Sequence, residues 1–159
     1  MLKTELVNPK NYIFGSTAAI ITNISLIVGL ETARSGKGPI LGGLLTIALA
    51  DNISDSLGIH MYKETEGATA RLTVLATVLN FTARLLISLS FIAIVLLCSA
   101  PRAVPAAVVW GLVLIAGGSF WIARRNRENV LVETVKHLLV ALVVILLSHA
   151  VGHLIAVYF

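Results

Sequence analysis

Two aspartates one helical turn apart, Asp51 and Asp55, are the residues best placed to do chemistry in this sequence. They lie in residues 50–58, which otherwise hold apolar, small or neutral polar side chains. A spacing of four places the carboxylates about 40° apart around a helix axis, on one face. Two like charges this close in a medium of low dielectric cannot both ionise cheaply, so they need a cation, a shared proton or an arginine. The spacing has two interpretations. The aspartates form a cation site coupled to protonation, or an arginine neutralises them and the group only stabilises the fold.

A lone arginine, Arg84, lies near the middle of another apolar stretch, with Asn80 one turn before it. An arginine at the centre of an apolar helix is costly and almost always has a partner. Asp51 or Asp55 is the expected partner. Such a pair is either a gate that a metal ion displaces or a permanent lock, and the sequence leaves both open.

Several further side chains are candidate ligands. Asn23, Asn52 and Ser54 could add neutral oxygens to the two aspartates, and oxygen ligands favour Mn²⁺ or Fe²⁺ over Cu⁺. His149 and His153 also share one helix face at a spacing that suits a transition metal. Alternatively these histidines are interfacial and bind the backbone or lipid headgroups. The Asp51 and Asp55 pair is therefore the predicted centre of the site.

The elements that position these residues are predicted to be membrane-spanning helices. The chain has 159 residues, 57% apolar and only 13% charged, and its mean hydropathy is +0.93. A soluble domain usually holds about 25% charged residues. A transmembrane helix needs about 20 predominantly apolar residues, and a barrel would show short alternating segments that are absent here. We therefore expect an all-α integral membrane protein with one domain, 1–159, and five helices at about 12–30, 39–62, 72–99, 103–123 and 135–158.

Proline and glycine mark the expected ends and contacts of these helices. Pro39 starts the second helix, and Gly67 follows its end. Pro101 and Pro105 are expected to bracket the turn between the third and fourth helices. Small-residue pairs at Gly38-x-x-x-Gly42 and Gly117-Gly118 predict close packing between helices.

The lysines and arginines between the spans predict the orientation. With the N-terminus in the cytoplasm, eight cations lie inside and three outside, whereas Arg84 lies within a span. The inner cations are Lys3, Lys10, Lys63, Arg71, Arg124, Arg125, Arg127 and Lys136, and the outer ones are Arg34, Lys37 and Arg102. Because positive residues favour the cytoplasmic side, we expect the N-terminus inside and the C-terminus outside.

Several classes of protein are disfavoured. The net charge is +4 and the isoelectric point about 9.6, but the excess sits in short loops, so no nucleic-acid partner is expected. The single cysteine, Cys98, allows no intrachain disulfide and no cysteine metal cluster. The first apolar stretch is too long for a cleavable signal peptide. No nucleophile–base pairing and no cofactor motif is found, so neither an enzyme nor a permanently bound cofactor is expected.

Two segments resemble the vacuolar iron transporter family. Ala50-Asp51-Asn52-Ile53-Ser54-Asp55-Ser56-Leu57-Gly58 resembles the family's ADxxSMxxGE stretch in its second helix. Residues 14–22, Phe-Gly-Ser-Thr-Ala-Ala-Ile-Ile-Thr, resemble the YGxxDGIVT stretch in its first helix, and Val151-Gly152-His153 resembles the end of its last helix. Only Asp51 and Ser54 carry over residue by residue. The family's helix-one aspartate is Ala18 here, and its helix-two methionine and glutamate are Asp55 and Ile59. A glycine of its third helix is Arg84 here.

The resemblance implies a homodimer that moves ferrous iron or manganese out of the cytosol against protons. The cytoplasmic metal-binding insertion of the plant and fungal members is absent between Lys63 and Arg71, which favours a prokaryotic plasma membrane. The alternative is a non-transporting scaffold or partner subunit that keeps the fold around an Arg–Asp lock. A carrier for an anionic solute bound by Arg84 ranks last, because the two aspartates would repel the substrate.

Overall fold

A computed structural model describes residues 10–159, and every regular element in that part of the chain is a helix. The helices are α2 (Lys10–Thr32), α3 (Lys37–Thr46), the π-helical segment η1 (Ile47–Asp51), α4 (Asn52–Thr65), α5 (Ala70–Leu97), α6 (Ala100–Asn126) and α7 (Val130–Tyr158). Since α3, η1 and α4 run on without a break, they form one span. Within the described residues, five helices are therefore long and apolar enough to cross a membrane, which confirms the predicted all-α membrane fold.

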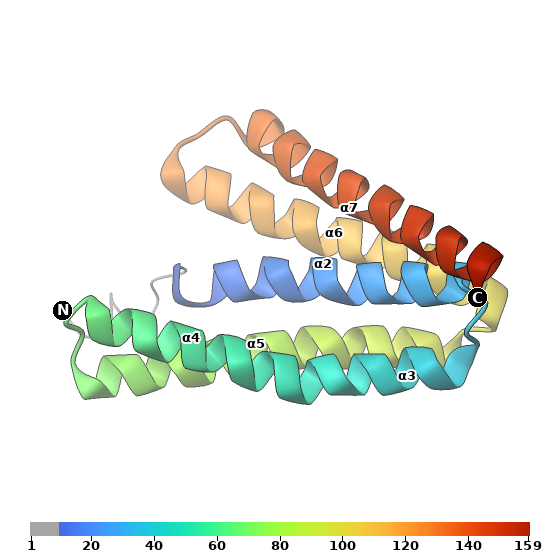
Figure 1. The fold of residues 1–159 in the computed structure, drawn as a ribbon. Helices are drawn as coiled ribbons and strands as arrows, with labels where there is room; N and C mark the ends of the chain where they lie inside the picture. The colour runs from blue at the N-terminus through green and yellow to red at the C-terminus, as the bar shows by residue number, and fades with distance from the viewer. Residues whose placement is uncertain (1–9) are drawn as a thin grey trace.

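The first helix is the centre of the bundle. α2 lies between two pairs of helices, with α5 and the α3–α4 span on one side and α6 and α7 on the other (Figure 1). It contacts α3, α5, α6 and α7, so each pair is joined to the other through α2. The α3–α4 span packs chiefly against α5, which leaves its other side without a neighbouring helix among residues 10–159.

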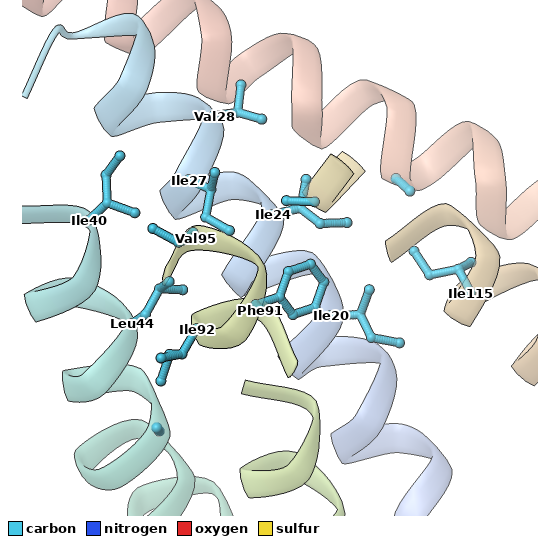
Figure 2. Packing of buried hydrophobic residues seen from close by; sticks show 13 residues of the cluster. Ile20, Ile24, Ile27, Val28, Ile40, Leu44, Phe91, Ile92, Val95 and Ile115 are labelled. Carbon is cyan, nitrogen blue, oxygen red and sulfur yellow. The ribbon is translucent and has the colours of Figure 1, made fainter. Parts of the chain in front are cut away.

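The apolar core surrounds one stretch of α2. Figure 2 shows isoleucines of α2 meeting Phe91 and Val95 of α5, Leu44 of α3 and Ile115 of α6. These α2 residues are Ile20, Ile24 and Ile27, and all are buried. Burying such side chains stabilises a fold less in lipid than in water, so close packing must hold these helices together.

Large apolar side chains also cover the outside of the bundle. The exposed ones on α7 include Leu139, Val143, Leu146 and Leu154. An outer surface of this kind suits contact with acyl chains, and an integral membrane protein needs it.

The helix ends match the predictions only in part. Gly67 adopts the left-handed conformation with φ 69° just after α4, as expected of a glycine that follows a helix end. The prediction that Pro101 and Pro105 bracket a turn is wrong. Pro101 lies in the first turn of α6 and Pro105 lies inside it, and the turn comes before, at Cys98 and Ser99. A proline in the first turn costs little, because those N–H groups have no partner within the helix.

Close packing occurs at other glycines than those predicted. A methyl group added to Gly152 of α7 would overlap the carbonyl of Gly29 on α2 and lie 2.8 Å from Cβ of Thr32. By contrast, nothing in the described chain lies within 4 Å of a methyl added to Gly38, Gly42, Gly117 or Gly118. These four glycines are exposed and make no close helix contact within the described residues, so their predicted packing stays a prediction.

Candidate functional site

The second span changes its helix type just before the two aspartates. The π-helical segment η1 ends at Asp51, and α4 continues from Asn52. A π turn holds more residues than an α turn, and such segments are rare and concentrate at functional positions. The surplus residue sets the direction in which Asp51 and the next turn point. No proline or glycine in residues 47–51 signals this change in the sequence.

Arg84 of α5 lies at the centre of the site and is only 1% exposed. Its Nη2 donates to Oδ2 of Asp51 at 2.6 Å, and its Nη1 forms an ion pair with Oδ2 of Asp55 at 2.5 Å. Its Nε donates to Oδ1 of Asn52 at 2.9 Å, and Nη1 also donates to the backbone carbonyl of Gly15 at 2.9 Å. The planar guanidinium thus joins α2, α4 and α5 at one point, and it pairs with both aspartates rather than with one.

The two aspartates face outward from this buried arginine. The side chain of Asp51 is 41% exposed and that of Asp55 is 46% exposed. Each presents Oδ2 to Arg84, and the rest of the carboxylate lies on the outer surface of the α3–α4 span. With both aspartates ionised, one positive and two negative charges leave the cluster with a net charge of −1. In a medium of low dielectric that remaining charge calls for a proton or a cation.

Gly15 allows α2 to approach the arginine this closely. A methyl group added to Gly15 would overlap Oδ1 of Asn80, lie 2.9 Å from Cγ of Asn80 and lie 3.2 Å from Cδ of Arg84. A glycine is therefore the residue that lets its carbonyl reach the guanidinium. The sequence showed Gly15 only as part of the family-like stretch and gave it no role.

The structure separates the predicted supporting ligands Asn52 and Ser54. Asn52 is fully buried, its Oδ1 accepts from Arg84, and its Nδ2 donates to the carbonyl of Ala48 at 2.9 Å. Both ends of this amide are thus engaged inside the bundle, where it positions the arginine. Ser54 is exposed on the outer surface together with Asp55. Asn52 faces inward because consecutive helix residues point about 100° apart.

Asn23 lies next to a different part of α5. It is fully buried, and its Nδ2 donates to the carbonyl of Ala19 at 2.7 Å and to Oγ of Ser88 at 3.1 Å. Its Oδ1 has no hydrogen-bond partner in the described chain. Ser88 follows Arg84 by one turn on α5. Asn23 of α2 thus contacts the same polar face of α5 as the site, but it does not contact the aspartates.

The two histidines of α7 lie far from Arg84. Nδ1 of His149 lies 3.0 Å from Oγ1 of Thr32 at the end of α2, and both His149 and His153 are exposed. Thr32 follows Gly15 by 17 residues, which is about 25 Å along a helix. The structure therefore does not bring these histidines into the Arg84 site.

Further polar contacts near the site were not predicted. Nδ2 of Asn80 donates to Oγ of Ser56 at 3.2 Å, and Nδ1 of His60 lies 3.1 Å from Oγ1 of Thr77. His60 thus bonds across to α5. The four-residue spacing of Asn52, Ser56 and His60 was a readable signal that one face of α4 is polar.

In residues 15–159, no group of three or more histidine, cysteine, aspartate or glutamate side chains could hold a metal ion.

No protein-family model, curated protein or solved structure matches this chain. The resemblance to the vacuolar iron transporter family therefore stays a prediction, and the class of protein defined by fold and site is a five-helix membrane protein with a charged centre.

Proposed function

We propose that this chain is a homodimeric carrier of divalent metal, Fe²⁺ or Mn²⁺, which exports the ion from the cytosol in exchange for protons. The observation that carries the proposal is the pair of half-exposed aspartates held by one buried arginine. The resemblance to the vacuolar iron transporter family supports the choice of ion and the direction. The short connection between α4 and α5 favours a prokaryotic plasma membrane.

The charge of the cluster fits a cation. Each chain contributes −1 when both aspartates are ionised, so two chains that meet at this surface contribute −2. One divalent ion neutralises that charge, and two protons do the same when the ion leaves. Exchange of a metal ion for protons thus keeps the centre of the membrane neutral at each stage.

The surface around the aspartates suits a second copy of the chain. Six small residues spaced four apart run along the α3–α4 span, and all are exposed: Gly38, Gly42, Thr46, Ala50, Ser54 and Gly58. We call this set the small-residue stripe. Stripes of this kind let two membrane helices approach closely. Asp51 and Asp55 each follow a stripe residue directly, so a dimer formed here removes both carboxylates from lipid and brings four of them together.

Arg84 acts as the gate in this proposal. Its two ion pairs hold the carboxylates while no metal is bound, and a metal ion competes for the same oxygens. Because Asn52 and the Gly15 carbonyl also bind the guanidinium, Arg84 keeps two partners when the aspartates turn to the ion. Ser54, on the exposed side of α4, adds a neutral oxygen ligand.

The test is metal uptake into proteoliposomes that contain the purified chain. Under a proton gradient, Mn²⁺ and Fe²⁺ enter the vesicles, and Asp55→Asn lowers the uptake at least about 10-fold because one ligand and one titratable group are lost. Glu133→Gln is the matched control, since Glu133 pairs with Lys136 at 2.6 Å near the start of α7. Uptake that Asp55→Asn leaves unchanged refutes the proposal.

The second candidate is a scaffold or partner subunit that does not transport. Arg84 of α5 has four partners on two other spans, and this favours a scaffold, because a lock of this kind also holds a fold together. For a scaffold, Asp55→Asn lowers thermal stability, and neither the parent nor the variant takes up metal. The same proteoliposomes therefore distinguish the two functions.

A further inference from the structure

An apolar groove lies between α6 and α7 on the outside of the bundle. Its volume is about 460 Å³, and it is lined by Val109, Leu112, Val113, Ala116, Leu138 and Leu142. Three of these side chains are 49–61% exposed, namely Val109, Val113 and Leu142, so the groove opens to the surroundings of the bundle. Because every lining side chain is apolar, the groove suits a hydrocarbon chain.

The face of α6 that forms the groove continues toward the α6–α7 turn with an aromatic ring and then a cation. Phe120 follows Ala116 by four residues, and Arg124 follows Phe120 by four, so the three residues lie on one face of the helix. Cζ of Arg124 lies 5.2 Å from the centre of the Phe120 ring, and this cation–π contact holds the guanidinium over that face. Both side chains are exposed. An apolar groove and a positive charge thus share one outer face.

The end of α6 carries an excess of positive charge. Residues 124–128 hold three arginines and one glutamate, which is a net charge of +2. Arg124 and Arg127 form no ion pair with the carboxylates of the described residues. Cζ of Arg125 lies 5.8 Å from the centre of the Trp121 ring, and a tryptophan at the end of a span is typical of the headgroup region. This end of α6 therefore has the composition of a surface that contacts anionic headgroups.

The distance between the charge and the groove matches the length of a lipid chain. Arg124 follows Ala116 by eight residues, or about 12 Å along a helix, and follows Val109 by fifteen residues, or about 22 Å. Half of the hydrocarbon core of a bilayer is about 15 Å thick. A chain that begins near Arg124 therefore enters the groove before it reaches the middle of the membrane.

We propose that α6 and α7 bind one anionic phospholipid, with its phosphate at Arg124 and Arg127 and an acyl chain in the groove at Val113 and Ala116. An anionic headgroup binds better than a choline headgroup, because choline adds a further cation beside arginines that have no carboxylate partner in the described chain. The site lies on the other side of α2 from Arg84, and its tests need no metal transport.

The first experiment measures which lipid lies beside Arg124. In a Trp110→Phe and Trp121→Phe background, Phe120→Trp keeps an aromatic ring at this position and supplies the single tryptophan of the chain. In mixed bilayers, quenching by brominated acyl chains gives the affinity for phosphatidylglycerol relative to phosphatidylcholine. Phosphatidylglycerol is expected to bind at least about fivefold more tightly, the scale of one cation near an anionic headgroup. Arg124→Gln is expected to remove most of this preference.

Val74→Trp, with Phe120 kept, is the matched control in the same background. Val74 is 53% exposed on α5, one turn after Arg71, and the α4–α5 turn lies at the same end of the bundle as the α6–α7 turn (Figure 1). One cation without the groove is expected to give a smaller preference. An equal preference at both positions, or one that Arg124→Gln leaves unchanged, overturns the proposal. A tryptophan at 120 that neither lipid quenches also overturns it, because another protein chain then covers the site.

The second experiment tests the groove by native mass spectrometry of the purified protein with added phosphatidylglycerol. The parent is expected to retain one lipid per chain. Val113→Phe fills the groove from a position that is 55% exposed, so the interior of the bundle is unchanged and most of the bound lipid is lost. Val143→Phe is the control, since Val143 is 54% exposed on α7 and does not line the groove.

Excess glycerol phosphate carries the phosphate without the acyl chains, and it is expected to leave the lipid bound. Displacement by glycerol phosphate would make the ligand a free phosphate compound and overturn the proposal. Retention that Val113→Phe leaves unchanged overturns it as well, because the groove then holds no chain.

Discussion

At the scale of single residues, Arg84 determines the arrangement of everything around it. A buried guanidinium with four partners is costly to desolvate, and removing one partner of such a group leaves charge uncompensated. The sequence predicted its pairing with an aspartate, because a charge in the middle of an apolar helix needs a counter-charge. It did not predict that both aspartates pair, since the π turn that directs Asp51 left no mark in residues 47–51.

The role of Asn52 shows where residue-level prediction failed. The sequence offered Asn52 as an oxygen ligand beside two aspartates, but its amide faces inward and binds Arg84 and Ala48. Neighbouring residues on a helix point in different directions, so adjacency along the chain is a poor guide to a shared site. Asn23 was likewise offered as an oxygen ligand to the aspartates, but the face of α2 on which it lies contacts Ser88 instead.

The close approach of α2 to α5 gives a prediction at this scale. Gly15→Ala is expected to lower the stability of the purified protein by about 1–3 kcal/mol, because the new methyl group overlaps the Asn80 amide. The measurement is thermal unfolding in detergent. Gly117→Ala is the control, since nothing in the described chain lies within 4 Å of the added methyl, and its stability should not fall. An unchanged melting temperature for Gly15→Ala would contradict the close contact.

At the scale of elements, the five spans were predictable because long apolar runs leave few alternatives in lipid. The ends of the spans were harder to predict, as the position of Pro105 inside α6 shows. The direction of each face was the hardest to predict. Gly38 and Gly42 were expected to mark close packing between helices, and they lie on the side of the second span that has no neighbour in residues 10–159.

The small-residue stripe leads to a cross-linking prediction. In a Cys98→Ser background, Ser54→Cys is expected to form an intermolecular disulfide under mild oxidation in membranes, because two copies meet along this stripe. Val113→Cys on α6 is the control, since Val113 is similarly placed in an apolar span and is 55% exposed. The readout is the dimer band on a non-reducing gel. Equal cross-linking at both positions, or none at Ser54→Cys, would argue against this interface.

At the scale of the whole molecule, α2 links two helix pairs, and only one of the two pairs holds the charged centre with α2. The α3–α4 span and α5 hold the Arg84 site with α2, whereas α6 and α7 add packing around α2 and a wide apolar exterior. The bundle can therefore present the charged surface of one pair to a partner while the other pair faces lipid.

The distribution of lysines and arginines predicts that the N-terminus lies in the cytoplasm and the C-terminus outside. In a Cys98→Ser background, Arg102→Cys at the start of α6 is expected to react with a membrane-impermeant maleimide in intact cells. Glu128→Cys, between α6 and α7, should react only after permeabilisation, because Arg124 and Arg125 at the end of α6 and Arg127 just after it place that turn in the cytoplasm. The opposite labelling pattern would place the N-terminus outside and reverse the inferred direction of transport.

The π turn at residues 47–51 has a mechanical consequence. It stores one surplus residue within an otherwise regular helix, and such a defect can move along a helix by breaking and remaking single backbone hydrogen bonds. Each residue that the defect passes rotates by about 100° around the axis. A shift of one turn toward Thr65 would pass Asp51 and rotate its carboxylate away from α5, whereas the flanking ends of the span would stay in place.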